Sequence, residues 1–217
     1  MSIAVLKTVA LIFMIFDHIG FFFPNLQYSI LLRIIGRIAA PIFFFCFVEG
    51  YTHTHNKKKY KNRLMISAIL MMYLNIIMIC VFKYLNAPLS TTITPLIPNM
   101  FFTFWIIFEI IDGLDNKKYI KLFWLFIVPF LEYNFFALAS ILVFKYVKNK
   151  KKKCFLFILI NGMLCLFMKN YLELFMIFSV VLFIFYNGER GNYSSKFFYI
   201  IYPLHFYLLA FLHYKTL

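Results

Sequence analysis

Nine continuously apolar segments, separated by short polar or charged stretches, run along the chain. Apolar residues fill successive positions in these segments instead of every second position, which favours membrane helices over the strands of a membrane barrel. A hydrocarbon core of about 30 Å needs about 20 helical residues, so the fifth to eighth segments are short and are consistent with tilted, re-entrant or merged helices. The pattern therefore predicts an all-α fold, a polytopic membrane helical bundle of about nine transmembrane helices in a single domain, residues 1–217. The predicted helices are residues 3–23, 28–50, 64–82, 93–111, 119–131, 133–147, 154–168, 171–187 and 197–214.

The composition agrees with a membrane protein. Hydrophobic residues make up 64% of the 217 positions, and 31 positions are Phe. A soluble domain of this size does not need so much apolar surface. The net charge of +14 does not indicate nucleic-acid binding, because the lysines and arginines lie in short loops between apolar segments, as in the cytoplasmic loops of membrane proteins.

The same lysines and arginines predict the topology. They concentrate in alternate loops, and the positive-inside rule assigns these loops to the cytoplasm. We therefore predict a multi-pass protein of the cytoplasmic membrane with the N-terminus cytoplasmic and the C-terminus outside. Residues 3–23 are expected to be a retained helix, because a polar pair interrupts the run and no small-residue cleavage site follows it. The predicted inside segments contain Lys7, Lys57, Lys58, Lys59, Lys61, Arg63, Lys117, Lys118, Lys121, Lys145, Lys148, Lys150, Lys151, Lys152, Lys153, Arg190 and Lys196, and the outside segments contain Lys83, Lys169 and Lys215.

Ionisable residues interrupt the first two apolar segments, which a very short turn joins into a hairpin. The first segment contains Lys7, Asp17 and His18, and the second contains Arg33, Arg37 and, near its end, Glu49. Charges in a membrane helix are costly, and they usually face a protein-lined cavity that has a function. The spacing of Lys7 and His18 places them about 20° apart around the helix and about 16 Å apart along its axis. We therefore expect both side chains on one stripe of the helix.

The short turn predicts which of these residues share a depth in the membrane. His18 and Arg33 are expected in the outer half, with Arg37 one turn deeper and Lys7 near the cytoplasmic face, so that a polar column from Lys7 to His18 faces the arginine pair. A histidine can act as a general base near neutral pH, and arginines can bind phosphate or stabilise an oxyanion. Asp17 lies about 100° from His18 around the helix, so we expect it to pair with an arginine or to orient the histidine. A purely structural Asp–Arg network between the helices is the alternative.

Other polar positions are candidates for a pocket. Glu49 and His53 lie at the cytoplasmic end of the second predicted helix, where a role in the helix end and loop is an equal alternative. Asn99 lies in an apolar run, and Glu132 lies at a predicted outer break. His205 lies in the middle of the last predicted helix, where a histidine is more often a satisfied bundle residue than a catalyst. No metal is expected, because the cysteines and histidines lack the spacing of metal ligands.

Seven segments along the chain carry motifs of a known family. They are LKTVALIFMIFDHIG, RIIGRIAAPIFFFCFVEGYTHT, KYKNRL, NMFFTF, EYNFFALASIL, YNGERG and KFFYIIYPLHFYLLA. These motifs resemble the TraX family of membrane proteins over essentially the whole chain, and the first hairpin and the YPLH segment are the most specific. TraX proteins are implicated in acetylating the N-terminal amine of conjugative pilin, and the family resembles the wider transmembrane acyltransferases, including acyltransferase family 3.

The resemblance implies roles for the ionisable residues. In the related acyltransferases, a basic residue with ten residues between it and a histidine marks the catalytic site, and Lys7 and His18 match this pattern. Arg33 and Arg37 resemble the arginine motif, with R-x3-R in place of R-x2-R, which leaves open which arginine meets which phosphate. The candidate catalytic residues are His18, Asp17 and His205, the candidate donor-binding residues are Lys7, Arg33 and Arg37, and the other pocket candidates are Glu49, His53, Asn99 and Glu132.

The resemblance also implies an activity. It implies an acetyltransferase that takes the acetyl group from acetyl-CoA, as donor substrate, and passes it to a peptide or pilin amine or another envelope acceptor, either directly or through an acetylated His18. The same chemistry would suit an O-acetyltransferase acting on a surface glycan or lipid. A small proton-coupled transporter with the His, Asp and Arg residues as its relay is the rival from another class, although no internal repeat supports it. The expected partners are acetyl-CoA, the acceptor and the lipid bilayer, without nucleic acid, and the oligomeric state stays open.

Overall fold

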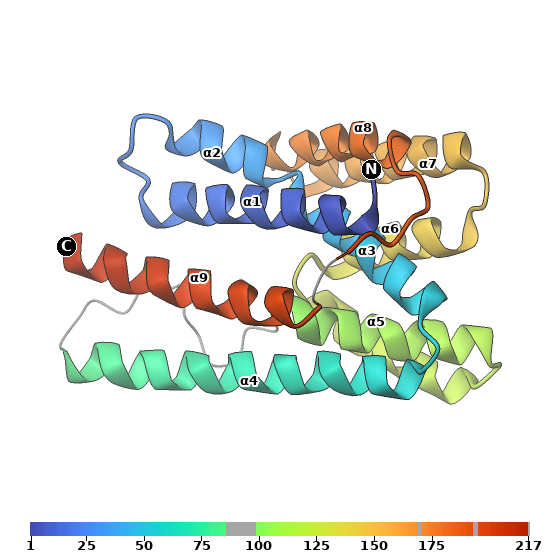
Figure 1. Cartoon of the computed structure of the whole chain (residues 1–217), viewed down its shortest axis with the longest axis horizontal. Coiled ribbons are helices and arrows are strands. Elements are labelled where there is room, and N and C mark those ends of the chain that lie inside the picture. Colours follow the sequence, from blue (N-terminus) through green and yellow to red (C-terminus); the bar gives the residue numbers. More distant parts are fainter. Residues whose placement is uncertain (86–98, 169–170, 193–194, 217) are drawn as a thin grey trace. The chain divides into compact units, whose positions relative to one another are not determined.

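The computed structural model describes residues 1–85, 99–168, 171–192 and 195–216, and every regular element in these residues is a helix (Figure 1). The predicted all-α class is therefore confirmed. Contacts divide the chain into two compact units, which are Met1–Val48 with Ala139–Leu217, and Glu49–Leu138. The single domain over the whole chain stays a prediction.

Four helical stretches among the described residues are long and apolar enough to cross a membrane. They are Ile3–Phe22, Ser29–His53, Lys57–Tyr84 and Phe197–Tyr214, and the shorter apolar helices are Tyr119–Phe130, Asn134–Tyr146 and Tyr171–Ile184. Residues 93–98 of the fourth predicted helix, 93–111, lie outside the described residues. The described part of this predicted helix belongs to α5 (Met100–Asp115). The apolar helices support a membrane protein, while the count of about nine spans and the cytoplasmic N-terminus stay predictions.

Helices α1 (Ile3–Phe22) and α2 (Ser29–Gly36) form the predicted hairpin in the first unit and lie side by side (Figure 1). Two glycines allow this close approach. A Cβ added to Gly36 would overlap the Cβ of Asp17 and lie 2.5 Å from its Cα, and a Cβ added to Gly20 would lie 2.5 Å from the carbonyl oxygen of Ser29. Small residues at a contact between membrane helices let the two backbones approach closely. The contact brings the end of α2 directly against Asp17.

The Gly36→Ala variant is expected to lower the free energy of unfolding by about 1–3 kcal/mol, because the added methyl group must push α1 and α2 apart. Gly162→Ala on α7 (Lys150–Met168) is the matched control, since a Cβ there meets nothing within 4 Å. Replacing a helical glycine without a clash should stabilise the protein by roughly 0.5–1 kcal/mol. Reversible unfolding in detergent micelles measures both changes, and a Gly36→Ala protein as stable as the parent would contradict the tight helix contact.

The second predicted helix, residues 28–50, is not continuous. Arg37 and Ile38 form a turn between α2 and α3 (Ala39–His53). Pro41 explains the break, because it has no N–H group to donate to the carbonyl oxygen of Arg37 four residues earlier. Proline is tolerated in the first turn of α3, where helical N–H groups have no partner within the helix. The break leaves Arg37 as the C-cap residue that directly follows α2.

Helix α9 (Ser195–Thr216) packs along α1 in the same unit. Leu11 and Met14 are buried on α1, and Ile201 and Tyr202 of α9 pack against the cluster to which they belong. These two α1 residues lie on the stripe that the sequence predicts for the ionisable residues of the first helix. Helix α9 therefore covers that stripe.

The rest of the first unit consists of the larger part of α3, α7, the 3-10 helix η2 (Tyr171–Phe178), α8 (Ser179–Ile184) and the larger part of α6 (Asn134–Tyr146). The eighth predicted segment is thus a 3-10 helix followed by a short α-helix. The chain after α8 binds the beginning of α1, because the N–H groups of Ile3 and Ala4 donate to the carbonyl oxygens of Glu189 (2.9 Å) and Arg190 (3.1 Å).

The second unit contains α4 (Lys57–Tyr84), α5 and the 3-10 helix η1 (Tyr119–Phe130). Its central polar contact is the buried Glu109 of α5, whose carboxylate binds the Nζ atoms of Lys61 and Lys121, each at 2.7 Å. The predicted break after η1 is present, since Tyr133 and Asn134 have positive φ angles of 58° and 34°. This unit is thus held by ion pairs between neighbouring helices.

Candidate functional site

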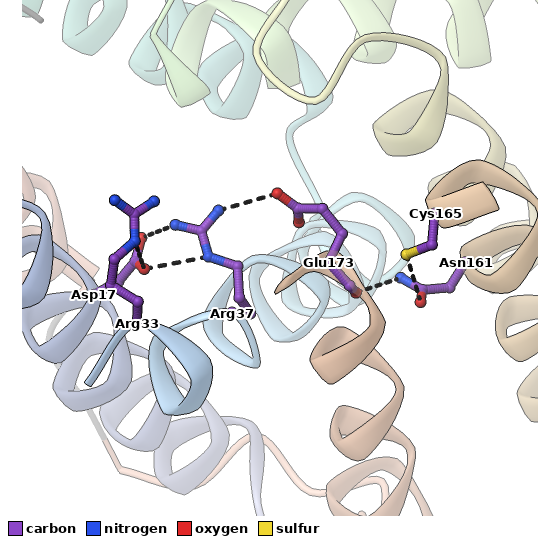
Figure 2. Close-up of polar contacts among 6 residues, drawn as sticks. All are labelled: Asp17, Arg33, Arg37, Asn161, Cys165 and Glu173. Atoms are coloured by element: carbon purple, nitrogen blue, oxygen red, sulfur yellow. Dashed lines mark hydrogen bonds and ion pairs between the residues drawn. The ribbon is translucent and has the colours of Figure 1, made fainter. Parts of the chain in front are cut away.

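Arg37 is the centre of a polar cluster in the first unit, which Figure 2 shows. Its guanidinium donates from Nε to Oδ1 of Asp17 at 3.2 Å and from Nη2 to Oδ2 of the same carboxylate. On the other side, Nη1 donates to Oε1 of Glu173 at 3.2 Å. The planar guanidinium fork suits this two-point contact with a carboxylate. The Arg37 side chain is only 11% exposed, and it joins α1, α2 and η2 through two carboxylates.

Arg33 lies one turn earlier on α2 and is held differently. Its Nε is 3.9 Å from Oδ1 of Asp17, which is too long for a hydrogen bond, and its guanidinium lies 5.1 Å from the centre of the Phe21 ring. The terminal nitrogens of Arg33 lie on the side of its guanidinium away from the Asp17 carboxylate (Figure 2). Within the described part of the chain the Arg33 side chain donates no hydrogen bond, and it is 29% exposed. Arg33 is therefore the arginine with donors available to a ligand.

The expected pairing of Asp17 with an arginine is confirmed, since both arginines approach the Asp17 carboxylate. The expectation that they face His18 is corrected, because His18 bonds to a residue of α9 instead. The physical reason is that a carboxylate attracts a guanidinium in apolar surroundings far more strongly than a neutral ring does. Asp17 directly precedes His18 on α1, so the arginines lie beside the neighbour of His18 along the helix.

His18 forms its hydrogen bond with His205 of α9. Nδ1 of His18 and Nε2 of His205 are 2.6 Å apart, the ring centres are 4.9 Å apart, and the ring planes differ by 9°. Two parallel rings with these distances lie nearly in one plane and meet edge to edge, because face-to-face stacking would hold the nitrogens farther apart. The Phe206 ring lies edge-on against His18, with ring centres 5.3 Å apart. The two histidines thus form an in-plane hydrogen-bonded pair.

Lys7 lies on the same side of α1 as His18. Its Nζ is 5.8 Å from the centre of the Phe198 ring on α9, while His18 meets His205 farther along the same helix. The predicted stripe therefore exists, and it faces α9.

Glu173 is a member of the cluster that the sequence analysis missed. Its backbone carbonyl oxygen accepts a hydrogen bond from Nδ2 of Asn161 (3.1 Å), and the thiol of Cys165 donates to Oδ1 of Asn161 (3.8 Å), as Figure 2 shows. These contacts extend the cluster to α7. A signal was present, because Glu173 is the only acidic residue in the apolar segment 171–187, and a charge in a membrane segment marks a functional candidate.

The four other pocket candidates belong to the second unit. Nδ1 of His53 lies 3.5 Å from Oε2 of Glu49. Asn99 caps α5, since its Oδ1 accepts from a backbone N–H of the first turn (3.1 Å) and its Nδ2 donates to a carbonyl oxygen of α4 (3.0 Å). Glu132 is partly buried after η1. Their pocket roles stay predictions, and among the described residues no three His, Cys, Asp or Glu side chains are grouped to hold a metal ion.

Comparison with known proteins adds a family match. The family model described as TraX protein matches residues 2–213. The chain is also similar to an uncharacterized protein of Rickettsia prowazekii (strain Madrid E), with 53% identity over 47 residues. That stretch covers 21% of this chain and only 17% of the relative's length. No solved structure matches the chain, so the family match is the comparison that covers nearly all of it.

Proposed function

Because the chain belongs to the TraX family, we propose that it is a membrane-embedded acyltransferase that moves an acetyl group from acetyl-CoA to an acceptor at or beyond the membrane. The proposed acceptor is the N-terminal amine of an exported peptide or pilin, which the resemblance to TraX proteins implies. The observation behind the proposal is the hydrogen-bonded pair of His18 and His205, next along α1 to Asp17, which the guanidinium of Arg33 approaches. A base and a cation near one another in an apolar bundle are what acyl transfer requires.

The charge balance of the cluster supports a role for Arg33 at the reacting carbonyl group. As carboxylates, Asp17 and Glu173 cancel the charges of Arg33 and Arg37. A phosphate would add uncompensated charge to an apolar region, which is costly. A tetrahedral oxyanion that forms while His18 takes up a proton adds one charge of each sign, so the balance is kept. We therefore assign Arg33 to the oxyanion and Arg37 to holding the two carboxylates.

The phosphates of the donor are assigned to the other end of α1. Lys7 lies about 16 Å from His18 along the helix axis, and the long, flexible pantetheine arm of acetyl-CoA can join phosphates near Lys7 to a thioester near His18. We place the Lys7 end in the cytoplasm. The basic start of α7 supports this, because Lys150 Nζ donates to the carbonyl oxygen of Ile184 (2.6 Å), beside the chain that binds the start of α1. Basic residues thus gather at this end, as the positive-inside rule expects of a cytoplasmic face.

The proposed reaction is a direct acyl transfer. The nitrogen of the acceptor amine bonds to the thioester carbon while His18 removes a proton from that nitrogen. The carbonyl oxygen becomes an oxyanion beside Arg33, and the C–S bond then breaks. The leaving thiolate takes the proton from His18, so that the products are an amide and free CoA and the histidine returns to its neutral form.

The His18→Ala variant is expected to lose at least about a hundredfold in the rate of acetyl transfer, because general-base catalysis contributes about 10²–10⁴-fold. The measurement uses purified protein, radiolabelled acetyl-CoA and peptides with a free or a blocked N-terminus. His55→Ala, at an exposed position of the second unit, is the control and should keep the parent rate. Equal rates for His18→Ala and the parent would remove His18 from the mechanism, and a parent without any transfer would contradict the proposed activity.

The same assay in sealed vesicles tests the sidedness. Acetyl-CoA does not cross a bilayer, so inverted vesicles, which expose the cytoplasmic face, should use added donor, and right-side-out vesicles should not. Mass spectrometry of the envelope separates the acceptor classes: acetylated peptides agree with the amine acceptor, whereas acetylated sugars or lipids alone would contradict it.

A further inference from the structure

The hydrogen bonds of the histidine pair determine where its protons lie. Nδ1 of His205 is 2.8 Å from the carbonyl oxygen of Ile201, one turn earlier on α9. A carbonyl oxygen can only accept, so Nδ1 of His205 must carry a proton. In a neutral imidazole the other nitrogen is then unprotonated. Nε2 of His205 is therefore an acceptor.

The proton position on His205 determines the proton position on His18. Its Nδ1 lies 2.6 Å from Nε2 of His205, nearly in the plane of both rings. Since Nε2 of His205 accepts, Nδ1 of His18 must be the donor, and Nε2 of neutral His18 has no proton. If Nε2 of a neutral His205 were the donor instead, its Nδ1 would have no proton, and the lone pair of Nδ1 would point at the lone pairs of the Ile201 oxygen. One backbone carbonyl thus sets the proton positions of two rings.

We propose that His205 is a positioning residue that holds His18 with its proton on Nδ1, so that Nε2 of His18 is the nitrogen that takes the proton of the acceptor. This inference rests on the proposed acyl transfer for its role in the reaction. The arrangement follows the logic of a catalytic triad, in which a third group bonds to Nδ1–H and leaves Nε2 as the base. Phe206 against His18 and Tyr202 against His205 hold the two rings in place, with ring centres 5.3 and 6.0 Å apart.

A neutral histidine suits this position better than the carboxylate of a triad. A carboxylate here would add a negative charge to a region where two carboxylates and two guanidiniums already balance. His205 can accept the hydrogen bond from the His18 imidazolium while it stays neutral itself, so the only new charges during the reaction are those of His18 and the oxyanion.

The test reads the ring protons directly. The chain has five histidines, and nitrogen-15 NMR of histidine-labelled protein in micelles reports which nitrogen of each neutral ring carries the proton, with the signals assigned by single substitutions. Free neutral histidine prefers the proton on Nε2. We expect His18 and His205 both to carry it on Nδ1. In His205→Leu, His18 should revert to the Nε2–H form, whereas His205→Gln, whose amide oxygen can accept, should keep the Nδ1–H form.

The rates of acetyl transfer separate positioning from mere packing. His205→Leu is expected to lose about tenfold to a hundredfold, since a hydrogen bond to a group that becomes charged is lost, and His205→Gln should recover most of that loss. His213→Leu, near the end of the same helix, is the control for a lost histidine. An Nε2–H form of His18 in the parent, an unchanged form in His205→Leu, or a His205→Gln rate as low as that of His205→Leu would overturn the inference. A parent that transfers no acetyl group refutes the proposed function, and with it the role of His205 in transfer, while the NMR result still decides the proton positions.

Discussion

Arg37→Met is expected to lower the free energy of unfolding by about 3–5 kcal/mol, the usual effect of removing one partner from a buried ion pair. Methionine replaces the aliphatic part of the side chain, so the loss reports the charge and its hydrogen bonds. Asp17 and Glu173 would both lose the guanidinium that binds them, and the ion pair that Arg33 forms among the described residues is with Asp17, at 3.9 Å. Denaturant unfolding in micelles, followed by circular dichroism, measures the change.

Two further variants test the physical reason. Arg33→Met makes the same change one turn earlier, at a side chain that is 29% exposed, and should cost much less stability. Arg37→Met with Glu173→Gln should be more stable than Arg37→Met, because the second change removes a carboxylate that has lost its counter-charge. Equal losses for Arg37→Met and Arg33→Met, or no recovery in the double variant, would contradict the central place of Arg37 in the ion-pair cluster.

The sequence predicted the parts of this site that depend on local geometry. Helical periodicity alone places Lys7 and His18 on one stripe, and the short turn brings α2 back along α1. The break before α3 was also within reach, since Pro41 removes a specific backbone hydrogen bond. Whether a segment forms a helix, and which residues share one face of it, depend on residues within a few turns. These neighbours can be read directly from the sequence.

The partners of these residues could not be predicted in the same way. His205 lies 187 positions after His18, and Glu173 lies 136 positions after Arg37. Which helix covers a given stripe depends on tertiary packing, and no helical period encodes it. Charge could have narrowed the choice. Asp17 is the acidic residue of the hairpin near the two arginines, while Glu49 lies at the far end of the second segment. Two buried arginines need a second carboxylate, and few apolar segments of this chain contain one.

Arg33→Met is expected to reduce kcat for acetyl transfer by about 10²–10³-fold, as does removal of an oxyanion donor in other enzymes. The KM for acetyl-CoA should change little, because the oxyanion exists only after the amine has attacked the carbonyl. The kcat of Arg33→Lys should fall between the values of the parent and of Arg33→Met, since an ammonium group on a flexible side chain replaces the planar guanidinium. Steady-state kinetics with varied acetyl-CoA and a fixed peptide acceptor give both constants.

Lys7→Met is expected to show the opposite kinetic pattern. The comparison of Lys7→Met with Arg33→Met tests whether the donor phosphates bind at Lys7 or at Arg33. If Lys7 binds the donor phosphates, its loss removes an interaction present equally before and during the reaction, so KM for acetyl-CoA should rise while kcat is nearly kept. A rise in KM with unchanged kcat in Arg33→Met would instead place a phosphate at Arg33. The neutral balance of Asp17, Arg33, Arg37 and Glu173 would then have to change on donor binding, and acetyl-CoA would have to place its charged groups deep in the membrane. The two kinetic patterns therefore decide whether the buried cluster stabilises a transient charge or binds a permanent one.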